Sequence, residues 1–130
     1  MSSINAKTYE PTPSAHVAFI GMGVMGYPMA GHLASAGHAV TVYNRSPAKA
    51  EAWVKEFAKS TAPKSALTPR EAAKGASIVF CCVGNDDDLR SVVFGADGML
   101  AGMEPGTVLV DHTTASADVA REIYAAAKNL

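Results

Sequence analysis

The chain has 130 residues, of which 48% are hydrophobic, and its formal net charge is −1 at pH 7. This length suits one compact domain that buries about two-thirds of the surface of its unfolded chain. The near-neutral charge gives no reason to expect a nucleic-acid partner or an acidic membrane surface. No apolar run approaches the roughly 20 residues that cross a bilayer, and no secretory signal is recognisable. We therefore expect no membrane partner and a cytoplasmic location.

The N-terminal residues and the two cysteines give two further expectations. Residues 1–14 contain few apolar side chains and two prolines, which predicts a flexible tail before a domain over residues 15–130. Cys81 and Cys82 are adjacent in an apolar run, where neighbouring strand residues point to opposite faces and a disulfide would be strained. We expect two buried free thiols, and with no further ligands at metal-site spacing we expect no metal.

The domain begins with a predicted strand over Val17–Ile20, and a glycine turn leads from this strand into a helix. Met25, Met29 and Leu33 are spaced four residues apart in that helix, which predicts that they share one apolar face. Gly37 is the expected stop at its C-terminal end.

A second strand is predicted over Ala39–Tyr43. Ser46 followed by Pro47 is a strong start signal for the next helix. That helix carries an apolar stripe with the spacing i, i+3, i+4 and i+7, formed by Ala50, Trp53, Val54 and Phe57. Weaker signals predict a short strand over Lys64–Ala66 and a short helix over Pro69–Ala73.

The strongest strand signal lies over Ser77–Val83, which is apolar throughout, as in a strand covered on both faces. A helix is predicted over Asp86–Phe94, and a glycine-containing turn then leads to a strand over Thr107–Asp111. Ser116 is the expected cap of a last helix, whose apolar face holds Val119, Ile123 and Ala126 or Ala127. Strands that alternate with helices predict an α/β fold, a Rossmann-type doubly wound parallel sheet in three layers.

Three glycines in G-x-G-x-x-G spacing lie between the first predicted strand and its helix, which favours a dinucleotide-binding turn. Gly21 permits the tight turn, Gly23 lets a pyrophosphate approach the backbone, and Gly26 lets the helix pack closely on the strand. The N–H groups at the helix start have the dipole sign that suits phosphates. The alternative is a glycine-rich turn without a ligand. The candidate residues are Gly21, Met22, Gly23, Val24, Met25 and Gly26.

The residues after the second strand indicate which dinucleotide is preferred. An acidic residue at this place accepts hydrogen bonds from a ribose 2′-OH and repels a 2′-phosphate. Here Asn44 is neutral, and Arg45 has a planar fork that suits a phosphate. Ser46 adds a hydroxyl and Lys49 a positive charge, so these residues favour NADP over NAD. The alternatives are a solvated arginine beside an ordinary helix cap and a site that accepts both cofactors.

Ligands bind outside the carboxyl ends of parallel strands, which places Val83, Gly84, Asn85 and the segment Asp111–Thr114 near the cofactor. Gly84 either leaves room for the adenosine or ribose or simply ends its strand. The acidic run Asp86–Asp88 is typical of a solvated helix start, with a direct functional role as the alternative. His112 is a candidate for proton transfer because a histidine pKa can lie near neutrality.

Together these residues resemble the β-hydroxyacid dehydrogenase family. Its members include 3-hydroxyisobutyrate dehydrogenases, tartronate semialdehyde (2-hydroxy-3-oxopropionate) reductases and the NAD(P)-binding domain of 6-phosphogluconate dehydrogenase. The resemblance runs from about residue 16 to the end, and it is carried by FIGMGVMGYPMAGHLASAGHAVTVYNRSPAK, GADGMLAGMEPGTVLVD and DHTTAS. The segment DHTT is the most specific of these.

The resemblance implies a role for each candidate residue. The loop 21–26 would hold the pyrophosphate, and residues 44–46 with Lys49 would hold the adenosine 2′-phosphate. The residues that would border the cofactor are Val83, Gly84 and Asp88. Thr114 would lie near the nicotinamide ribose, and Thr113, which stands where the family usually has serine, is a candidate substrate-binding residue.

One departure from the family pattern is large. The family's catalytic lysine lies in a G-x-x-G-x-G-x-x-x-K-x-x-N motif, which does not occur in this sequence, and Lys128 is not its equivalent. The substrate-contacting S-G-G segment is missing as well. We therefore expect the N-terminal cofactor half of a two-domain NAD(P)-dependent oxidoreductase, truncated before a helical C-terminal domain, with no catalytic residue in this chain.

The complete enzyme would transfer hydride between the nicotinamide and a small semialdehyde, keto acid or hydroxy acid, while the fragment alone would be inactive. The alternatives are an NADP(H)-binding module without turnover and an imine reductase-like enzyme, against which the DHTT segment argues. The identity of the substrate, the direction of the reaction and the formation of a homo-oligomer are left open.

Overall fold

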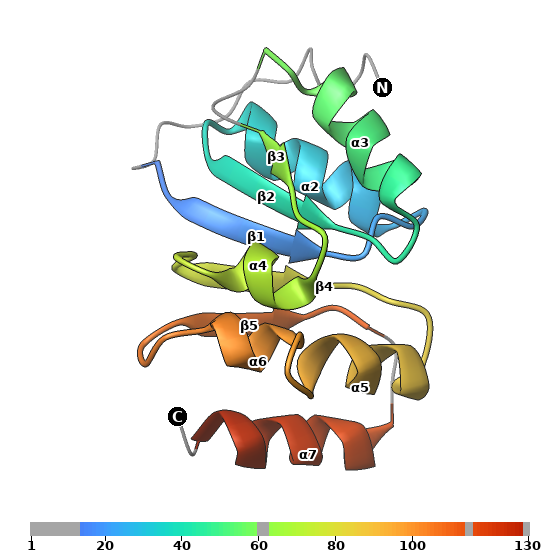
Figure 1. Ribbon diagram of the computed structural model, residues 1–130, viewed down its shortest axis with the longest axis vertical. Coiled ribbons are helices and arrows are strands. Elements are labelled where there is room, and N and C mark those ends of the chain that lie inside the picture. The colour runs from blue at the N-terminus through green and yellow to red at the C-terminus, as the bar shows by residue number, and fades with distance from the viewer. Residues whose placement is uncertain (1–13, 60–62, 114–115, 129–130) are drawn as a thin grey trace.

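The structure is a computed structural model that describes residues 14–59, 63–113 and 116–128. Its sheet has five parallel strands in the order β3-β2-β1-β4-β5, with helices on both faces (Figure 1). The strands are β1 (His16–Ile20), β2 (Ala39–Tyr43), β3 (Lys64–Ser65), β4 (Ile78–Cys81) and β5 (Val108–Asp111). The helices are α2 (Gly26–Ser35), α3 (Pro47–Glu56), α4 (Pro69–Ala73), α5 (Asp86–Val93), α6 (Met99–Gly102) and α7 (Ala117–Lys128). The predicted Rossmann-type, three-layer fold is confirmed.

The strands end level with one another at one edge of the sheet. Ile20 of β1 is in register with Tyr43 of β2 and with Cys81 of β4, and Cys81 is in register with Asp111 of β5. The chain runs outward from β1 to β2 and β3 in one direction, and then to β4 and β5 in the other. The strand order therefore reverses beside β1, which is where open parallel sheets bind their ligands.

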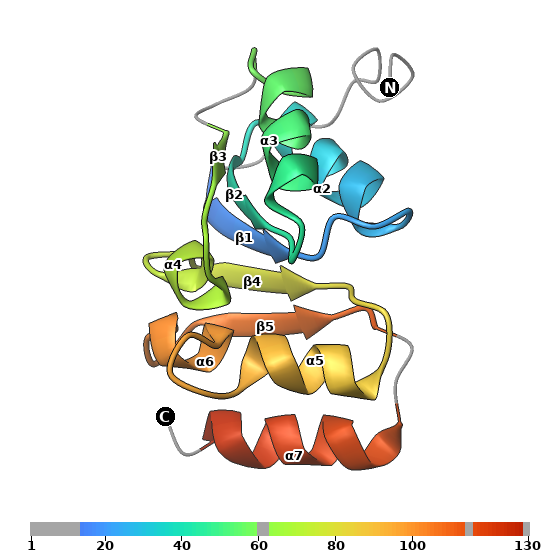
Figure 2. The same ribbon diagram turned by 45° about the vertical axis from the view of Figure 1, so that its right-hand side comes forward.

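The central strand β1 is buried on both faces over Val17–Ile20, as its apolar sequence predicts, whereas β4 alternates half-buried and buried residues and the edge strands β3 and β5 have no buried residue. On one face Phe19 packs with Trp53 and Phe57 from α3 and its C-terminal end, and α2 joins this layer. On the other face Ile20 and Cys81 pack against side chains from α4, α5, α6 and α7. Figure 2 shows α2 and α3 on one side of β1 and β2, with α4 on the opposite side.

The predicted apolar face of α2 is confirmed only in part. Met29 and Leu33 are half-buried and pack against the core, whereas Met25 is 66% exposed. The fully buried residues of α2 are instead small ones, namely Gly26, Ala30, Gly31 and Ala34. The reason is close approach, since a Cβ at Gly26 would overlap the carbonyl oxygen of Gly21. Spacing of large apolar residues therefore identified only part of the face, because glycine and alanine make its closest contacts.

Several local expectations also changed. Strand β4 ends at Cys81 rather than Val83, and the short helix α6 was not predicted. A four-residue helix beginning after Gly98 shows no readable periodicity, although its Met99 is fully buried. Ser46 does occupy the N-cap position of α3, but its hydroxyl makes no capping hydrogen bond. By contrast, the hydroxyl of Ser116 does accept from the Val119 N–H at the start of α7.

The structure also tests the expectations for the cysteines, the N-terminal segment and membrane spans. Both cysteines are free; Cys81 is buried as expected, whereas Cys82 is half-buried, which corrects the expectation that both are buried. Residues 1–13 of the predicted tail lie outside the described residues, and the hydroxyl of Ser14 donates to the Gly37 carbonyl at 2.9 Å. Among the described residues, every helix is too short or too polar to span a bilayer.

Candidate cofactor-binding site

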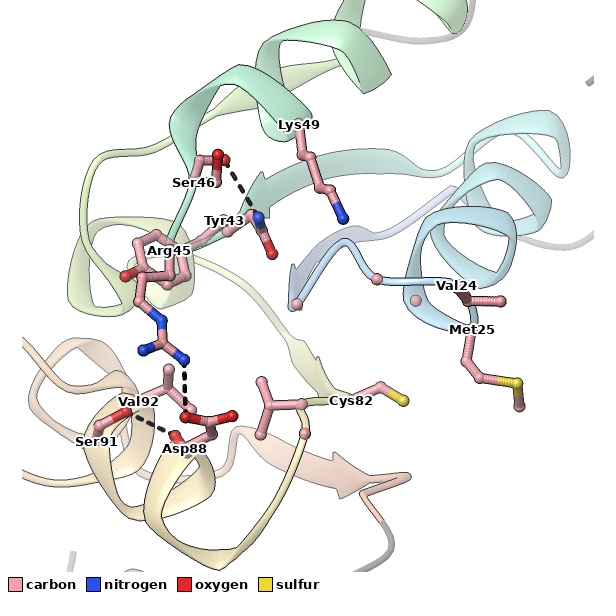
Figure 3. Close-up of a pocket in the computed structure, with 16 residues that line it drawn as sticks. Val24, Met25, Tyr43, Arg45, Ser46, Lys49, Cys82, Asp88, Ser91 and Val92 are labelled. Carbon is pink, nitrogen blue, oxygen red and sulfur yellow. Dashed lines mark hydrogen bonds and ion pairs between the residues drawn. The ribbon is translucent and has the colours of Figure 1, made fainter.

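An open cavity of about 860 Å³ lies at the edge where β1, β2 and β4 end, and α3 and α5 begin beside it (Figure 3). Its volume falls within the range of about 300–1,000 Å³ that is usual for small-molecule sites. It is lined by Gly21, Gly23, Val24, Met25, Gly26, Tyr43, Asn44, Arg45, Ser46, Lys49, Cys82, Val83, Gly84, Asp88, Ser91 and Val92. Most of the predicted cofactor residues therefore come together around one cavity.

The glycine turn has the geometry that each glycine was expected to provide. Gly21 has φ +105°, and a Cβ there would collide with the carbonyl of Cys82, so a larger residue does not fit. An added Cβ at Gly23 would meet no atom within 4 Å, so its backbone is open to the cavity. The N–H groups of residues 23–26 donate to no acceptor among the described residues. These groups at the start of α2 are free to bind an anion.

Asn44 connects the glycine turn to the segment after β2. Its Oδ1 accepts a hydrogen bond from the Met22 N–H at 2.9 Å, and its Nδ2 donates to the Ser46 carbonyl at 3.2 Å. The Met22 side chain itself is buried in the core and does not line the cavity. Met22 therefore stands apart from the other predicted cofactor residues, and Asn44 has a structural function that sequence reasoning missed.

The side chains after β2 differ in their partners. Arg45 is 82% exposed, and its Nη2 lies 2.8 Å from Oδ1 of Asp88 in the first turn of α5. Lys49 has no ion-pair partner among the described residues, and Figure 3 shows it extending from α3 toward the space above the glycine turn. Ser46 lies at the start of α3, and its hydroxyl makes no capping hydrogen bond (Figure 3). Two cations and one hydroxyl thus line the cavity.

The predicted residues after β4 and β5 are arranged differently from one another. Val83 and Gly84 line the cavity. Thr113 does not line the cavity. Its hydroxyl accepts a hydrogen bond from the Val83 N–H at 3.0 Å and so connects the two loops. Thr114 lies outside the described residues. The ring of His112 stacks on Phe80, with centroids 6.3 Å apart, and also does not line the cavity.

Four lining residues were missed, namely Tyr43, Cys82, Ser91 and Val92. Ser91 and Val92 follow Asp88 by three and four positions in α5, so helical spacing could have identified them once Asp88 was placed at the site. The hydroxyl of Ser91 donates to the Asp88 carbonyl at 2.7 Å. Burial, with a smaller contribution from the Asp111 carboxylate, raises the pKa of the Cys82 thiol, so that the thiol stays protonated at neutral pH.

Comparison with known proteins identifies the family. A family model, the NAD binding domain of 6-phosphogluconate dehydrogenase, matches residues 16–130. The chain belongs to this family. The open glycine turn and the cavity at the strand-order reversal are thus features of an NAD-binding domain, and the resemblance found in the sequence is confirmed at the level of the family.

Three similar proteins illustrate the relationship. An uncharacterized oxidoreductase from Shewanella frigidimarina is 64% identical over 111 residues, which are 85% of this chain and 37% of that protein. A 3-hydroxyisobutyrate dehydrogenase from Mycobacterium tuberculosis, solved with L-serine, is 30% identical with a TM-score of 0.76, covering 90% of this chain and 38% of that one. An imine reductase from Myxococcus stipitatus in complex with NADP⁺ is 26% identical with a TM-score of 0.74, covering 88% and 37%. The chain spans a little over a third of each relative's length.

Proposed function

We propose that this NAD-binding domain holds NADP(H) for an oxidoreductase that interconverts a small hydroxy acid with its semialdehyde or keto acid. The observation that carries the proposal is that Arg45, Ser46 and Lys49 line the same cavity as the open glycine turn. When bound, the cofactor supplies a hydride donor or acceptor at the nicotinamide, and the protein supplies binding and orientation.

The donor set fits the charges of this dinucleotide. The free N–H groups of residues 23–26 and the dipole of α2 suit the pyrophosphate. Arg45 can bind a 2′-phosphate in a bidentate manner, and Lys49 adds a second positive charge. Both the oxygen and the nitrogen of the Asn44 amide are hydrogen-bonded to the backbone, and the side chain brings no negative charge to this region. An NAD site would gain little from two cations at this place.

The loops after β4 and β5 would hold the other half of the cofactor. Thr113 fixes the Val83 N–H, which positions the loop that lines the cavity beside Gly84. We propose that Thr114 lies near the nicotinamide ribose and that Thr113 acts on substrate binding through this loop. The family resemblance assigns the proton to a lysine in a motif that the sequence lacks, so we propose that these 130 residues bind the cofactor but do not turn over substrate.

An imine reductase-like activity is the second candidate, supported by the structural neighbour that was solved with NADP⁺. Both candidates use the same cofactor but differ in the group that accepts the hydride. This group is a C=O in the hydroxy acid reaction and a C=N in the imine reductase-like reaction. Comparing semialdehydes with cyclic imines as substrates of the full-length protein distinguishes them. Turnover of either by the purified 130-residue chain would contradict the binding-only role of the chain.

The cofactor proposal is tested by isothermal titration of NADPH and NADH into the chain. Loss of a charge-assisted hydrogen bond costs about 1.5–3 kcal/mol, so we expect Arg45→Ala to weaken NADPH binding about 10- to 150-fold. NADH binding should change little. The matched control is Arg121→Ala, since Arg121 is also exposed and paired with an aspartate, but lies on α7 outside the cavity. Equal affinities for the two cofactors would refute the proposal.

A further inference from the structure

The ion pair between Arg45 and Asp88 spans the cavity from the segment after β2 to the start of α5 (Figure 3). We propose that Asp88 is a specificity-determining residue, which competes with the 2′-phosphate of NADP(H) for the guanidinium of Arg45. Asp88 thereby lowers the affinity for NADP(H) relative to the affinity for NAD(H). This inference rests on the proposed function, because it concerns the same cavity and the same arginine.

The backbone of Asp88 is held by two hydrogen bonds. Its N–H donates to Oδ1 of Asn85 at 2.9 Å, and its carbonyl accepts from the Ser91 hydroxyl at 2.7 Å. Its side chain is 28% exposed. The second carboxylate oxygen lies over Gly84, where an added Cβ would approach it to 2.7 Å. The space at Gly84, which we expected to serve the cofactor or to end the strand, is thus used by this carboxylate.

Arg45 is the more exposed member of the pair. It is 82% exposed and lies in the loop between β2 and α3, so its side chain can turn between two acceptors. An exposed ion pair of this kind is weak, which means that a phosphate can displace the carboxylate. A 2′-phosphate can therefore compete with the Asp88 carboxylate for the guanidinium of Arg45 and displace it at a small cost in free energy.

Displacing Asp88 from Arg45 lowers the affinity for NADP(H) but not the affinity for NAD(H). The charged side chains that line the cavity are Arg45, Lys49 and Asp88, with a net charge of +1. A 2′-phosphate must either replace Asp88 on the guanidinium or share the guanidinium with a like charge. A neutral ribose 2′-OH leaves the pair intact. Removing the carboxylate therefore raises the affinity for NADP(H) selectively.

The test compares dissociation constants of NADPH and NADH for the chain and for Asp88→Asn, which keeps the shape of the side chain. The strength of exposed ion pairs predicts that NADPH binding tightens about twofold to fivefold, while NADH binding changes less than that. The control is Asp87→Asn, because Asp87 lies in the same first turn, is 97% exposed and does not contact Arg45. This control removes the same charge from the same helix start and should leave the ratio unchanged.

A double-mutant cycle with Arg45→Ala separates competition from simple repulsion. With alanine at position 45 there is no guanidinium to compete for, so Asp88→Asn should no longer change the ratio. The same pair of titrations with 2′,5′-ADP and 5′-AMP checks that the effect belongs to the 2′-phosphate. An unchanged or lower preference for NADPH in Asp88→Asn overturns the inference, as does an equal effect in the Arg45→Ala background.

Failure of the proposed function gives a different result. In that case the unsubstituted chain shows no preference for NADPH, and Arg45→Ala alone has no effect. Urea unfolding of each variant confirms that the comparison concerns folded protein, and the exposed position of Arg45 and the conservative change at Asp88 make large losses of stability unexpected.

Discussion

Asn44 gives the sharpest prediction, because its structural and electrostatic contributions can be separated by two substitutions. Asn44→Ala removes the acceptor of the Met22 N–H, which belongs to a residue that is almost fully buried. An unpaired buried N–H costs about 1–3 kcal/mol. We expect the free energy of unfolding to fall by that amount, and the glycine turn to lose its fixed position. Binding of NADH and NADPH should weaken together.

Asn44→Asp keeps the acceptor for Met22 but loses the donor to the Ser46 carbonyl. It also places a negative charge beside the proposed 2′-phosphate site. Two like charges about 4 Å apart repel by about 1 kcal/mol in water and by about 4 kcal/mol near a protein surface. We expect NADPH binding to weaken at least about fivefold, with NADH binding largely kept.

The assay combines urea unfolding with calorimetric titration of both cofactors. If Asn44→Ala leaves the unfolding free energy unchanged, the hydrogen bond to Met22 does not hold the glycine turn. If Asn44→Asp leaves NADPH binding as tight as before, the 2′-phosphate does not lie near this residue. Either result would refute the reasoning at a defined step.

Two further predictions concern the walls of the cavity. Gly26→Ala places a Cβ against the Gly21 carbonyl and 3.2 Å from the Phe19 ring, and should lower the free energy of unfolding by about 1–3 kcal/mol. Gly23→Ala meets no atom and should keep the stability while weakening cofactor binding; equal unfolding curves for the two variants would contradict this. Because burial raises the pKa of Cys82 above the ordinary 9.0, iodoacetamide labelling of the half-buried thiol should be slow at pH 7 and faster as the pH rises. Bound NADP⁺ should protect it, and labelling in Cys82→Ser at the native rate would refute the assignment.

Much of the fold could be predicted from the sequence, because each strand and long helix has its own local signal. The helix α4 (Pro69–Ala73) was predicted with its observed bounds, and the glycine spacing located the cavity. Apolar spacing predicted only part of the core-facing side of α2, since its buried residues are small ones such as Gly26 and Ala30.

Contacts between distant segments could not be predicted. The hydrogen bond from Met22 to Asn44 joins residues 22 positions apart, and the pair of Arg45 and Asp88 joins residues 43 positions apart. Both depend on the register that brings the ends of β1, β2 and β4 level. The sequence pattern predicts which residue types follow each strand, but the register of the sheet determines which of these residues are in contact.

The central claim is that the cavity binds NADP(H) with its 2′-phosphate between Arg45 and Lys49. The most direct measurement follows backbone amide shifts of the ¹⁵N-labelled chain during titration with NADP⁺ and with NAD⁺. Both cofactors should shift the amides of residues 21–26, and the difference between them should be centred on the non-proline amides of residues 45–49, where α3 begins, and on Asp88, the partner of Arg45. The claim is contradicted if the two cofactors give the same shifts at residues 45–49, or if the largest shifts lie away from the glycine turn.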